Sequence, residues 1–271
     1  MLTFWKMTAA GNDFILVDAR AGLPAGTAAL AAALCPRAVS VGADGLLAVV
    51  AAVPGRVEID YRNADGSAAE FCGNGARCAA RYAVERGIAG SPLELVFPGH
   101  AVRARVDGGS VEIEGPRPLV DLAAIEVEAG GRAVRARLVC AGVRHVVLRD
   151  PADGGLALRD VRDALDAARP DLAGTYNVTA IGEQAPGRLR VRTLERGSGE
   201  TLACGSAAWA AAAFVEDPPG SGLELTVIPP AGVPLSVRLL PGAGPALLRG
   251  EARIVFRGEL AAESLPAAGR P

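Results

Sequence analysis

Two segments of this 271-residue chain carry the same local pattern. The first runs from Gly66 to Ala76 and the second from Gly197 to Ala207. Each begins with Gly-Ser, passes through a glutamate and an apolar residue to Cys-Gly, and ends in a run rich in small residues. Such a repeat favours a fold built from two copies of one unit. A chance match between two Ala- and Gly-rich segments is the alternative.

Short strands separated by turn signals, together with four helices, are predicted along the chain. The strand-like segments of the first part are Leu2–Lys6, Asn12–Asp18, Gly45–Ala51, Val57–Arg62, Leu93–Phe97, Ala101–Asp107 and Ser110–Glu114. Those of the second part are Arg132–Cys140, Val143–Arg149, Asn177–Ile181, Leu189–Leu194, Leu223–Ile228, Pro234–Leu240 and Ala246–Phe256. The helical segments are Gly26–Leu34, Asn74–Arg86, Asp160–Arg169 and Ser206–Phe214. Two helices and many short strands in each half predict an α/β (α+β) fold of two similar halves.

The stretch Gly115-Pro116-Arg117-Pro118 interrupts this pattern and is the predicted junction. We expect one half over residues 1–116, carrying Cys72, and a second over 117–257, carrying Cys204. A chain of this length is long enough for two cores of ordinary size.

Charge and hydropathy exclude several classes of partner. The formal net charge is −2, and Lys and Arg form no long block, so nucleic acid is not expected as a partner. The longest apolar stretch, Ala28–Leu34, is too short to span a bilayer. Lys6, Asn12 and Asp13 stand where a signal peptide would need an apolar core, so we expect a cytoplasmic protein with no membrane partner.

The five cysteines, Cys35, Cys72, Cys78, Cys140 and Cys204, show no metal-ligand spacing, and the chain has only two histidines. A disulfide framework and a Cys/His metal site are therefore not expected. Most free cysteines are small buried hydrophobic residues. We expect this of Cys35, Cys78 and Cys140, so a catalytic role for the other two needs local evidence.

That evidence is the sequence around each repeated cysteine. Cys72 directly precedes Gly73-Asn74-Gly75 and a helix, and Cys204 precedes Gly205-Ser206 and a helix. The unpaired N–H groups of a helix start favour a thiolate and lower its pKa. Glycines there let backbone amides approach an anion such as a carboxylate. Each copy alone predicts a reactive thiol beside an anion cradle.

Two copies facing one cleft would place a substrate α-carbon between two sulfurs. One thiolate would remove the α-proton while the opposite thiol donates a proton to the other face, which inverts the stereocentre. The amides would stabilise charge that spreads into the carboxylate. This chemistry needs no pyridoxal lysine, and Lys6 is the only lysine of the chain.

The chain resembles diaminopimelate epimerases from Met7 to about Gly258. The matching motifs are Met7–Phe14, Gly42–Gly45, Asn63–Ser67, Phe71–Cys78 and Arg192–Ser206. The resemblance implies two pseudo-symmetric domains, each a mixed, barrel-like sheet around central helices, with the first completed by the tail from about 258 to 271. It also implies a homodimer, no cofactor or metal, and interconversion of LL- and meso-diaminopimelate in lysine and peptidoglycan synthesis.

By position, the resemblance assigns the acid/base pair to Cys72 and Cys204. It assigns His145 and Glu195 to supporting roles. The residues it implies for substrate binding are Asn12, Asn63, Gly73, Asn74, Asn177, Glu195, Arg196, Gly205 and Ser206. Without the resemblance, Asn12, Asn63 and Asn177 would be read as turn residues and Glu195-Arg196 as a solvated surface pair.

The chain departs from the family pattern in its second half. Val143-Arg144 replaces the usual Asn-Pro before His145, and Ala207-Ala208-Trp209 replaces Gly-Ala-Cys. Valine cannot hydrogen-bond the distal end of diaminopimelate. Two alternatives therefore stay open: a two-cysteine racemase of another amino acid, such as histidine or proline, and a non-catalytic binding or redox protein that uses the thiols.

Overall fold

The computed structural model describes residues 2–69, 71–150, 155–197, 199–215, 222, 224–242 and 244–265. The chain divides into two compact units: unit 1 is Met1–Ile113 with Gly250–Pro271, and unit 2 is Glu114–Arg249. Both combine a mixed β-sheet with a few helices, which confirms the predicted fold class.

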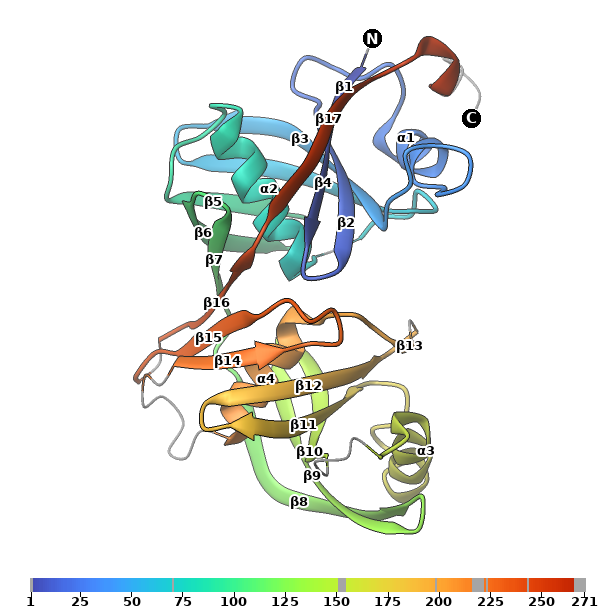
Figure 1. The fold of residues 1–271 in the computed structure, drawn as a ribbon, viewed down its shortest axis with the longest axis vertical. Coiled ribbons are helices and arrows are strands. Elements are labelled where there is room, and N and C mark those ends of the chain that lie inside the picture. The colour runs from blue at the N-terminus through green and yellow to red at the C-terminus, as the bar shows by residue number, and fades with distance from the viewer. Residues whose placement is uncertain are drawn as a thin grey trace. The chain divides into compact units, whose positions relative to one another are not determined.

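The sheet of unit 1 runs in the order β17-β1-β2-β3-β4-β5-β6-β7 (Figure 1). Its strands are β1 (Leu2–Ala9), β2 (Asn12–Asp18), β3 (Gly45–Val53), β4 (Arg56–Asn63), β5 (Leu93–Phe97), β6 (His100–Asp107), β7 (Ser110–Gly115) and β17 (Arg253–Leu260). The pairs β2–β3 and β4–β5 are parallel. A parallel pair needs a crossover, and helices α1 (Thr27–Leu34) and α2 (Gly73–Glu85) supply the two crossovers.

Unit 2 repeats this topology. Its sheet runs β8-β9-β10-β11-β12-β14-β15-β16, and β10–β11 and β12–β14 are its parallel pairs. The strands are β8 (Leu119–Ala129), β9 (Arg132–Ala141), β10 (Val143–Arg149), β11 (Asn177–Ala185), β12 (Arg188–Glu195), β13 (Gly199–Glu200), β14 (Glu224–Ile228), β15 (Leu235–Leu239) and β16 (Ala246–Glu251). Helices α3 (Leu158–Ala168) and α4 (Gly205–Val215) cross over where α1 and α2 do in unit 1. Because the two units share one strand order, a chance match does not explain the repeat seen in the sequence.

Helices α2 and α4 each lie against several strands of their own sheet. Helix α2 contacts β1, β2, β3, β5 and β6, and α4 contacts β8 to β12 and β15. A helix enclosed in this way has little room for a polar face. Small side chains meet most of this demand. Between Ala207 and Ala213, α4 buries six alanines along with Trp209, and α2 buries four alanines and Cys78. The prediction that Cys78 belongs to the core is thereby confirmed.

Helices α1 and α3 build a second core in each unit. Leu158, Val161 and Leu165 of α3 recur at helical spacing and pack into one apolar cluster with strands β8 to β11. Leu30, Ala31 and Leu34 do the same for α1 with β2 and β3. A helix with one apolar stripe covers a sheet face and leaves its other side to solvent.

The strands near the unit boundary differ from the prediction. Residues Ala246–Phe256 were expected to form one strand, but the chain leaves β16 at Glu251 and starts β17 at Arg253. Strand β17 pairs antiparallel with β1, so it belongs to unit 1, although the sequence placed residues up to 257 in the second half. Strand β8 was not predicted. A half-buried strand usually alternates apolar and polar residues, but exposed positions of β8 carry the apolar residues Leu119 and Leu122, so this alternation is missing from its sequence. The short 3₁₀ helix η1 (Ala262–Ser264) follows β17.

Candidate active site

Cys72 stands at the N-cap position of α2 in an extended conformation, with φ −143° and ψ 120°. Its carbonyl accepts the first helical bond from Ala76 N–H, at 2.8 Å. The next residue, Gly73, is half-buried, and a Cβ added there would meet only Ile113, at 3.5 Å. Packing therefore does not demand glycine at position 73. Binding of an anion by the first N–H groups of α2 stays a prediction.

Cys204 occupies the same place in unit 2. Its carbonyl accepts a bond from Ala208 N–H at 3.2 Å, and α4 begins at the next residue. Both cysteines, together with the glycines that follow them, thus start the enclosed helix of their unit, as the repeat predicts. The pairing of the two sulfurs across one substrate stays a prediction.

The electrostatic setting of Cys204 differs from the expectation of a lowered thiol pKa. Burial first, and then the Glu195 carboxylate, raise the pKa of Cys204 to about 12, although a hydrogen bond with Ser206 opposes the rise. The Sγ atom lies 3.3 Å from Oγ of Ser206. Loss of hydration therefore outweighs the helix start, and Cys204 holds its proton at neutral pH.

His145 connects this cysteine to the interior of unit 2. It is fully buried on β10, with Nδ1 at 2.9 Å from Oγ1 of Thr179 and Nε2 at 3.0 Å from Oγ of Ser206. Burial lowers the pKa of His145 to about 4, so the ring is neutral at neutral pH. A chain of hydrogen bonds thus runs from Thr179 through His145 and Ser206 to Cys204.

Glu195, at the end of β12, faces the same cysteine. Its Oε1 accepts a bond from Oγ1 of Thr201, at 2.6 Å, and its side chain also hydrogen-bonds Cys204. The adjacent Arg196 is exposed. Asn177, which is buried at the start of β11, accepts a bond from the backbone N–H of Arg196 at its Oδ1, at 2.9 Å. Asn177 therefore holds the loop that carries Arg196.

In unit 1, the structure brings Asn12 and Asn74 together. The Nδ2 of Asn74 donates to Oδ1 of Asn12 at 2.6 Å. Asn12 follows a tight turn in which both Ala10 and Gly11 have positive φ, 48° and 92°. A non-glycine residue rarely adopts such an angle, and strain of this kind is found where a structure must hold a functional group in place.

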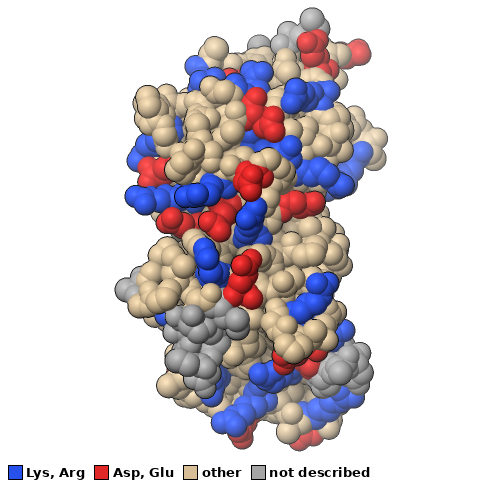
Figure 2. Space-filling model, turned by 60° about the vertical axis from the view of Figure 1, so that its left-hand side comes forward, with Lys and Arg blue, Asp and Glu red and all other residues tan. Residues whose placement is uncertain are grey.

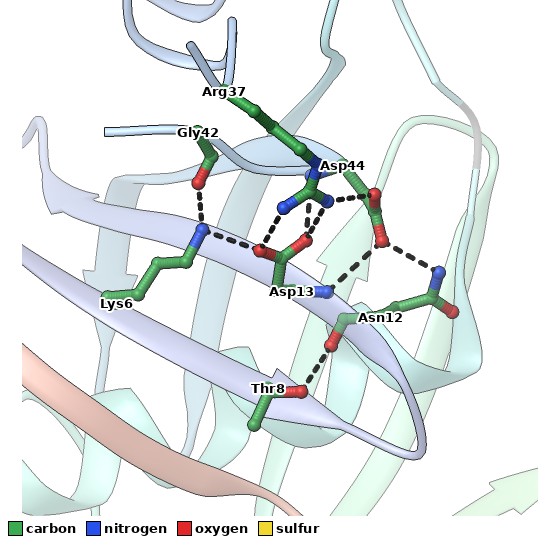
Figure 3. A network of polar contacts seen from close by, with 7 residues as sticks. All are labelled: Lys6, Thr8, Asn12, Asp13, Arg37, Gly42 and Asp44. Carbon is green, nitrogen blue, oxygen red and sulfur yellow. Dashed lines mark hydrogen bonds and ion pairs between the residues drawn. The ribbon is translucent and has the colours of Figure 1, made fainter. Parts of the chain in front are cut away.

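A charged cluster supports Asn12 from the other side (Figure 3). Asp13 lies 2.7 Å from Lys6 Nζ and 2.6 Å from Nη2 of Arg37, which also reaches Asp44. Burial alone would raise the pKa of Asp13, but the hydrogen bonds and charges of Arg37 and Lys6 lower it to about 2. Lys6, the only lysine of the chain, also donates to the carbonyl of Gly42.

Asn63 has a local partner instead. Its Nδ2 donates to Oγ of Ser67 at 3.0 Å, within the turn that follows β4. This geometry matches the alternative reading of Asn63 as a turn residue. A contact between Asn63 and substrate stays a prediction.

The departures from the family pattern have clear structural positions. Val143 begins β10 and is 44 % exposed, and the exposed Arg144 reaches Oγ1 of Thr175, with Nη1 at 3.5 Å. Trp209 is buried, and a Cβ added to Gly115 would lie 2.2 Å from its ring. The absence of a side chain at Gly115 therefore makes the space that Trp209 occupies.

Sequence reasoning missed Thr179, Thr201, Asp44 and Arg77. Asp44 and Arg77 each lie within a matched motif, but the sequence assigned neither of them a role. Thr179 and Thr201 carry no local signal, because their bonds to His145 and Glu195 depend on strand pairing.

Within the described ranges, no group of three or more His, Cys, Asp and Glu side chains is arranged to hold a metal ion. The same part of the chain contains no helix long and apolar enough to cross a membrane. Figure 2 shows basic and acidic side chains interspersed over the face that it draws.

Comparison with known proteins gives consistent matches. The family model described as diaminopimelate epimerase matches residues 4–116. A diaminopimelate epimerase of Xylella fastidiosa (strain M12) is 36% identical over 275 residues, covering 95% of each chain. That of Moorella thermoacetica is 33% identical over 278 residues, covering 94% of this chain and 98% of its own.

Solved structures share the fold at low identity. A phenazine biosynthesis protein of the PhzF family from Enterococcus faecalis superimposes with a TM-score of 0.70 at 14% identity, covering 96% of this chain and 99% of its own. A hydroxyproline epimerase from Agrobacterium vitis gives 0.67 at 13% identity, covering 95% and 91%.

Proposed function

The chain belongs to the diaminopimelate epimerase family and is an isomerase, and we propose that it inverts the α-carbon of diaminopimelate with Cys72 and Cys204. The observation that supports this most directly is the duplicated placement of the cysteines. Each precedes the enclosed helix of its unit, in units of the same strand order. The product would serve lysine and peptidoglycan synthesis.

In the proposed reaction, the two cysteines start in different protonation states. Cys204 is protonated at neutral pH, because burial and Glu195 raise its pKa to about 12. In one direction of the proposed reaction, Cys204 donates its proton to one face of the α-carbon, while Cys72, as the thiolate, removes the α-proton from the other face. After inversion the two residues have exchanged protonation states, so the reverse reaction starts from the other side of the α-carbon.

The carbanion needs stabilisation of its charge. The N–H groups of Gly73-Asn74 and Gly205-Ser206 begin two helices, where the dipole and the unpaired donors favour a carboxylate. Charge that spreads from the α-carbon into the carboxylate is stabilised by donors already in position, which is usually the largest electrostatic contribution to such a reaction.

We propose that no pyridoxal cofactor takes part. A Schiff base needs a neutral lysine amine. Lys6, the only lysine, is buried, paired with Asp13 at 2.7 Å and hydrogen-bonded to the carbonyl of Gly42. Freeing it would break the cluster that holds Asp13.

The distal amino-acid group of the substrate is assigned to the loop that begins at Glu195-Arg196. Arg196 is exposed and its backbone is fixed by Asn177, which suits recognition of a carboxylate by a guanidinium. Asn12 and Asn63 complete the proposed substrate contacts in unit 1. We further propose a homodimer in the cytoplasm, as the family resemblance implies.

A second candidate is a racemase of another amino acid with the same two-thiol chemistry. Val143 favours it, because an apolar side chain stands where the family pattern has asparagine. The fold is compatible with either substrate, since it is shared with a hydroxyproline epimerase. A non-catalytic thiol protein is the third candidate.

The test is exchange of the α-hydrogen with solvent deuterium, followed by mass spectrometry. We expect the purified protein to label diaminopimelate, and the Cys72→Ala and Cys204→Ala variants to lose racemisation. Labelling of another amino acid but not diaminopimelate would select the second candidate. Full racemisation by both variants would exclude the two-base mechanism.

A further inference from the structure

Arg77 is buried completely in the first turns of α2, just after the residues of the proposed anion cradle. Its Nη2 donates to Oδ1 of Asn74 at 2.7 Å, and its other nitrogens donate to the carbonyls of Glu251 and Gly73, at 3.3 and 3.4 Å. A guanidinium has five donors and no acceptor. The atom of Asn74 that faces Arg77 must therefore be the amide oxygen.

Asp44 imposes the opposite requirement on Asn12 (Figure 3). Its Oδ2 accepts bonds from Nδ2 of Asn12, at 3.0 Å, and from the backbone N–H of Asp13, at 3.2 Å, while Oδ1 accepts from Arg37. An ionised carboxylate only accepts hydrogen bonds. The atom of Asn12 that faces Asp44 must therefore be the amide nitrogen.

The orientation that Arg77 requires of Asn74 is compatible with the orientation that Asp44 requires of Asn12. Asn74 then turns its nitrogen, and Asn12 its oxygen, toward the contact between them, which is the 2.6 Å bond from Nδ2 to Oδ1. The nitrogen and oxygen of an asparagine amide are usually assigned from their partners. Here a pure donor and a pure acceptor at the two ends fix both amides, because turning either one over would oppose like groups at two contacts.

We infer that Arg77 and Asp44 are positioning residues, which hold the amides of Asn74 and Asn12 in one direction so that Asn12 presents its second N–H to the substrate. Asn12 is half-buried, its oxygen is used by Asn74, and one hydrogen of its nitrogen is used by Asp44. The donor that remains suits a carboxylate oxygen of an amino acid. This role rests on the proposed function, whereas the fixed direction of the amides does not.

A double-mutant cycle tests the fixed direction without any substrate. In Asn74→Asp, carboxylates at 74 and 44 both require the nitrogen of Asn12, so we expect a lower unfolding temperature. Asp44→Asn should destabilise the wild-type chain but should be neutral or stabilising in the Asn74→Asp background, because Asn12 is then free to turn over. Equal effects of Asp44→Asn in both backgrounds would overturn the inference. A folded double variant beside an unfolded Asn74→Asp chain would support it.

A measurement on the unmodified protein covers the case in which the variants do not fold. The chain has four asparagines, Asn12, Asn63, Asn74 and Asn177, so selective ¹⁵N labelling gives four side-chain NH₂ signals. We expect the NH₂ hydrogen that Asn74 donates to Asn12, and the one that Asn12 donates to Asp44, to exchange with water at least about tenfold more slowly than the one that Asn63 donates in its exposed turn. Equal exchange rates would overturn the inference.

The link to substrate is tested by the Michaelis constant. Arg77→Gln offers both a donor and an acceptor, so we expect KM for diaminopimelate to rise about tenfold with a smaller change in kcat, and Arg77→Lys to restore most of the loss. Arg81→Gln is the matched control, because Arg81 lies one turn later on α2 and donates to the carbonyl of Ala252. Unchanged KM in Arg77→Gln, with the amide exchange pattern intact, would overturn the positioning role. Absence of turnover in the wild-type protein would instead refute the proposed function.

Discussion

The Nε2 atom of His145 lies 3.0 Å from Oγ of Ser206, although the two residues are 61 positions apart in sequence. Ser206 in turn lies 3.3 Å from the sulfur of Cys204. The buried imidazole therefore holds the hydroxyl that touches the thiol, and its own second nitrogen is held by Thr179. Removing the imidazole should disturb the thiol as well as the core of unit 2.

His145 should make stability depend on pH. Its pKa is about 6.5 in the unfolded chain and about 4 in the fold. Between these values the unfolded chain binds a proton that the folded chain does not, so the free energy of unfolding should fall as pH drops from 6.5 to 4. The loss should be on the order of 3 kcal/mol. Urea unfolding at several pH values should show a shallower dependence for His145→Gln. The exposed His100→Gln variant is the control, and equal slopes for His145→Gln and wild type would contradict the prediction.

Glu195 should suppress the reactivity of Cys204 in the absence of substrate. In Glu195→Gln the neighbouring negative charge is removed, so the pKa of Cys204 should fall from about 12. A nearby charge commonly shifts a pKa by about one unit or more, so alkylation by iodoacetamide at pH 8 should rise about tenfold. Peptide mass spectrometry in a Cys72→Ser background identifies the labelled residue. An unchanged rate would show that burial alone controls this thiol.

Gly115 should not tolerate a side chain. A Cβ there would lie 2.2 Å from the ring of Trp209, so Gly115→Ala should destabilise unit 2 by about 1–3 kcal/mol. Trp209→Leu in the same chain should recover part of this loss by removing the ring. Gly90→Ala is the matched control, since its Cβ would meet open space. Thermal unfolding that is unchanged by Gly115→Ala would contradict the packing argument.

Val143 should limit recognition of a polar distal group. It is exposed enough for its side chain to meet a ligand, and Val143→Asn adds an amide there. We expect the new amide to hydrogen-bond a charged group of diaminopimelate and so to lower KM for this substrate about tenfold. Val53→Asn, at an exposed site at the end of β3, is the control. A rise in KM for diaminopimelate together with a fall for another amino acid would favour the second candidate.

The sequence by itself determined the repeat, the four helices and the placement of Cys72 and Cys204 before two of them. These features depend on local periodicity and on neighbouring residues. It also separated the core cysteine Cys78 from the candidate catalysts, because the position of Cys78 inside a helix is a local property.

Only the tertiary structure decided the protonation of Cys204, the pairing of β17 with β1, and the partners of the polar side chains. The thiol pKa depends on burial and on Glu195, which strand pairing brings to it. The bond between Asn12 and Asn74 joins residues 62 positions apart. Desolvation and hydrogen bonding depend on which residues are close in space. In this chain, strand pairing within the sheets decides which residues these are.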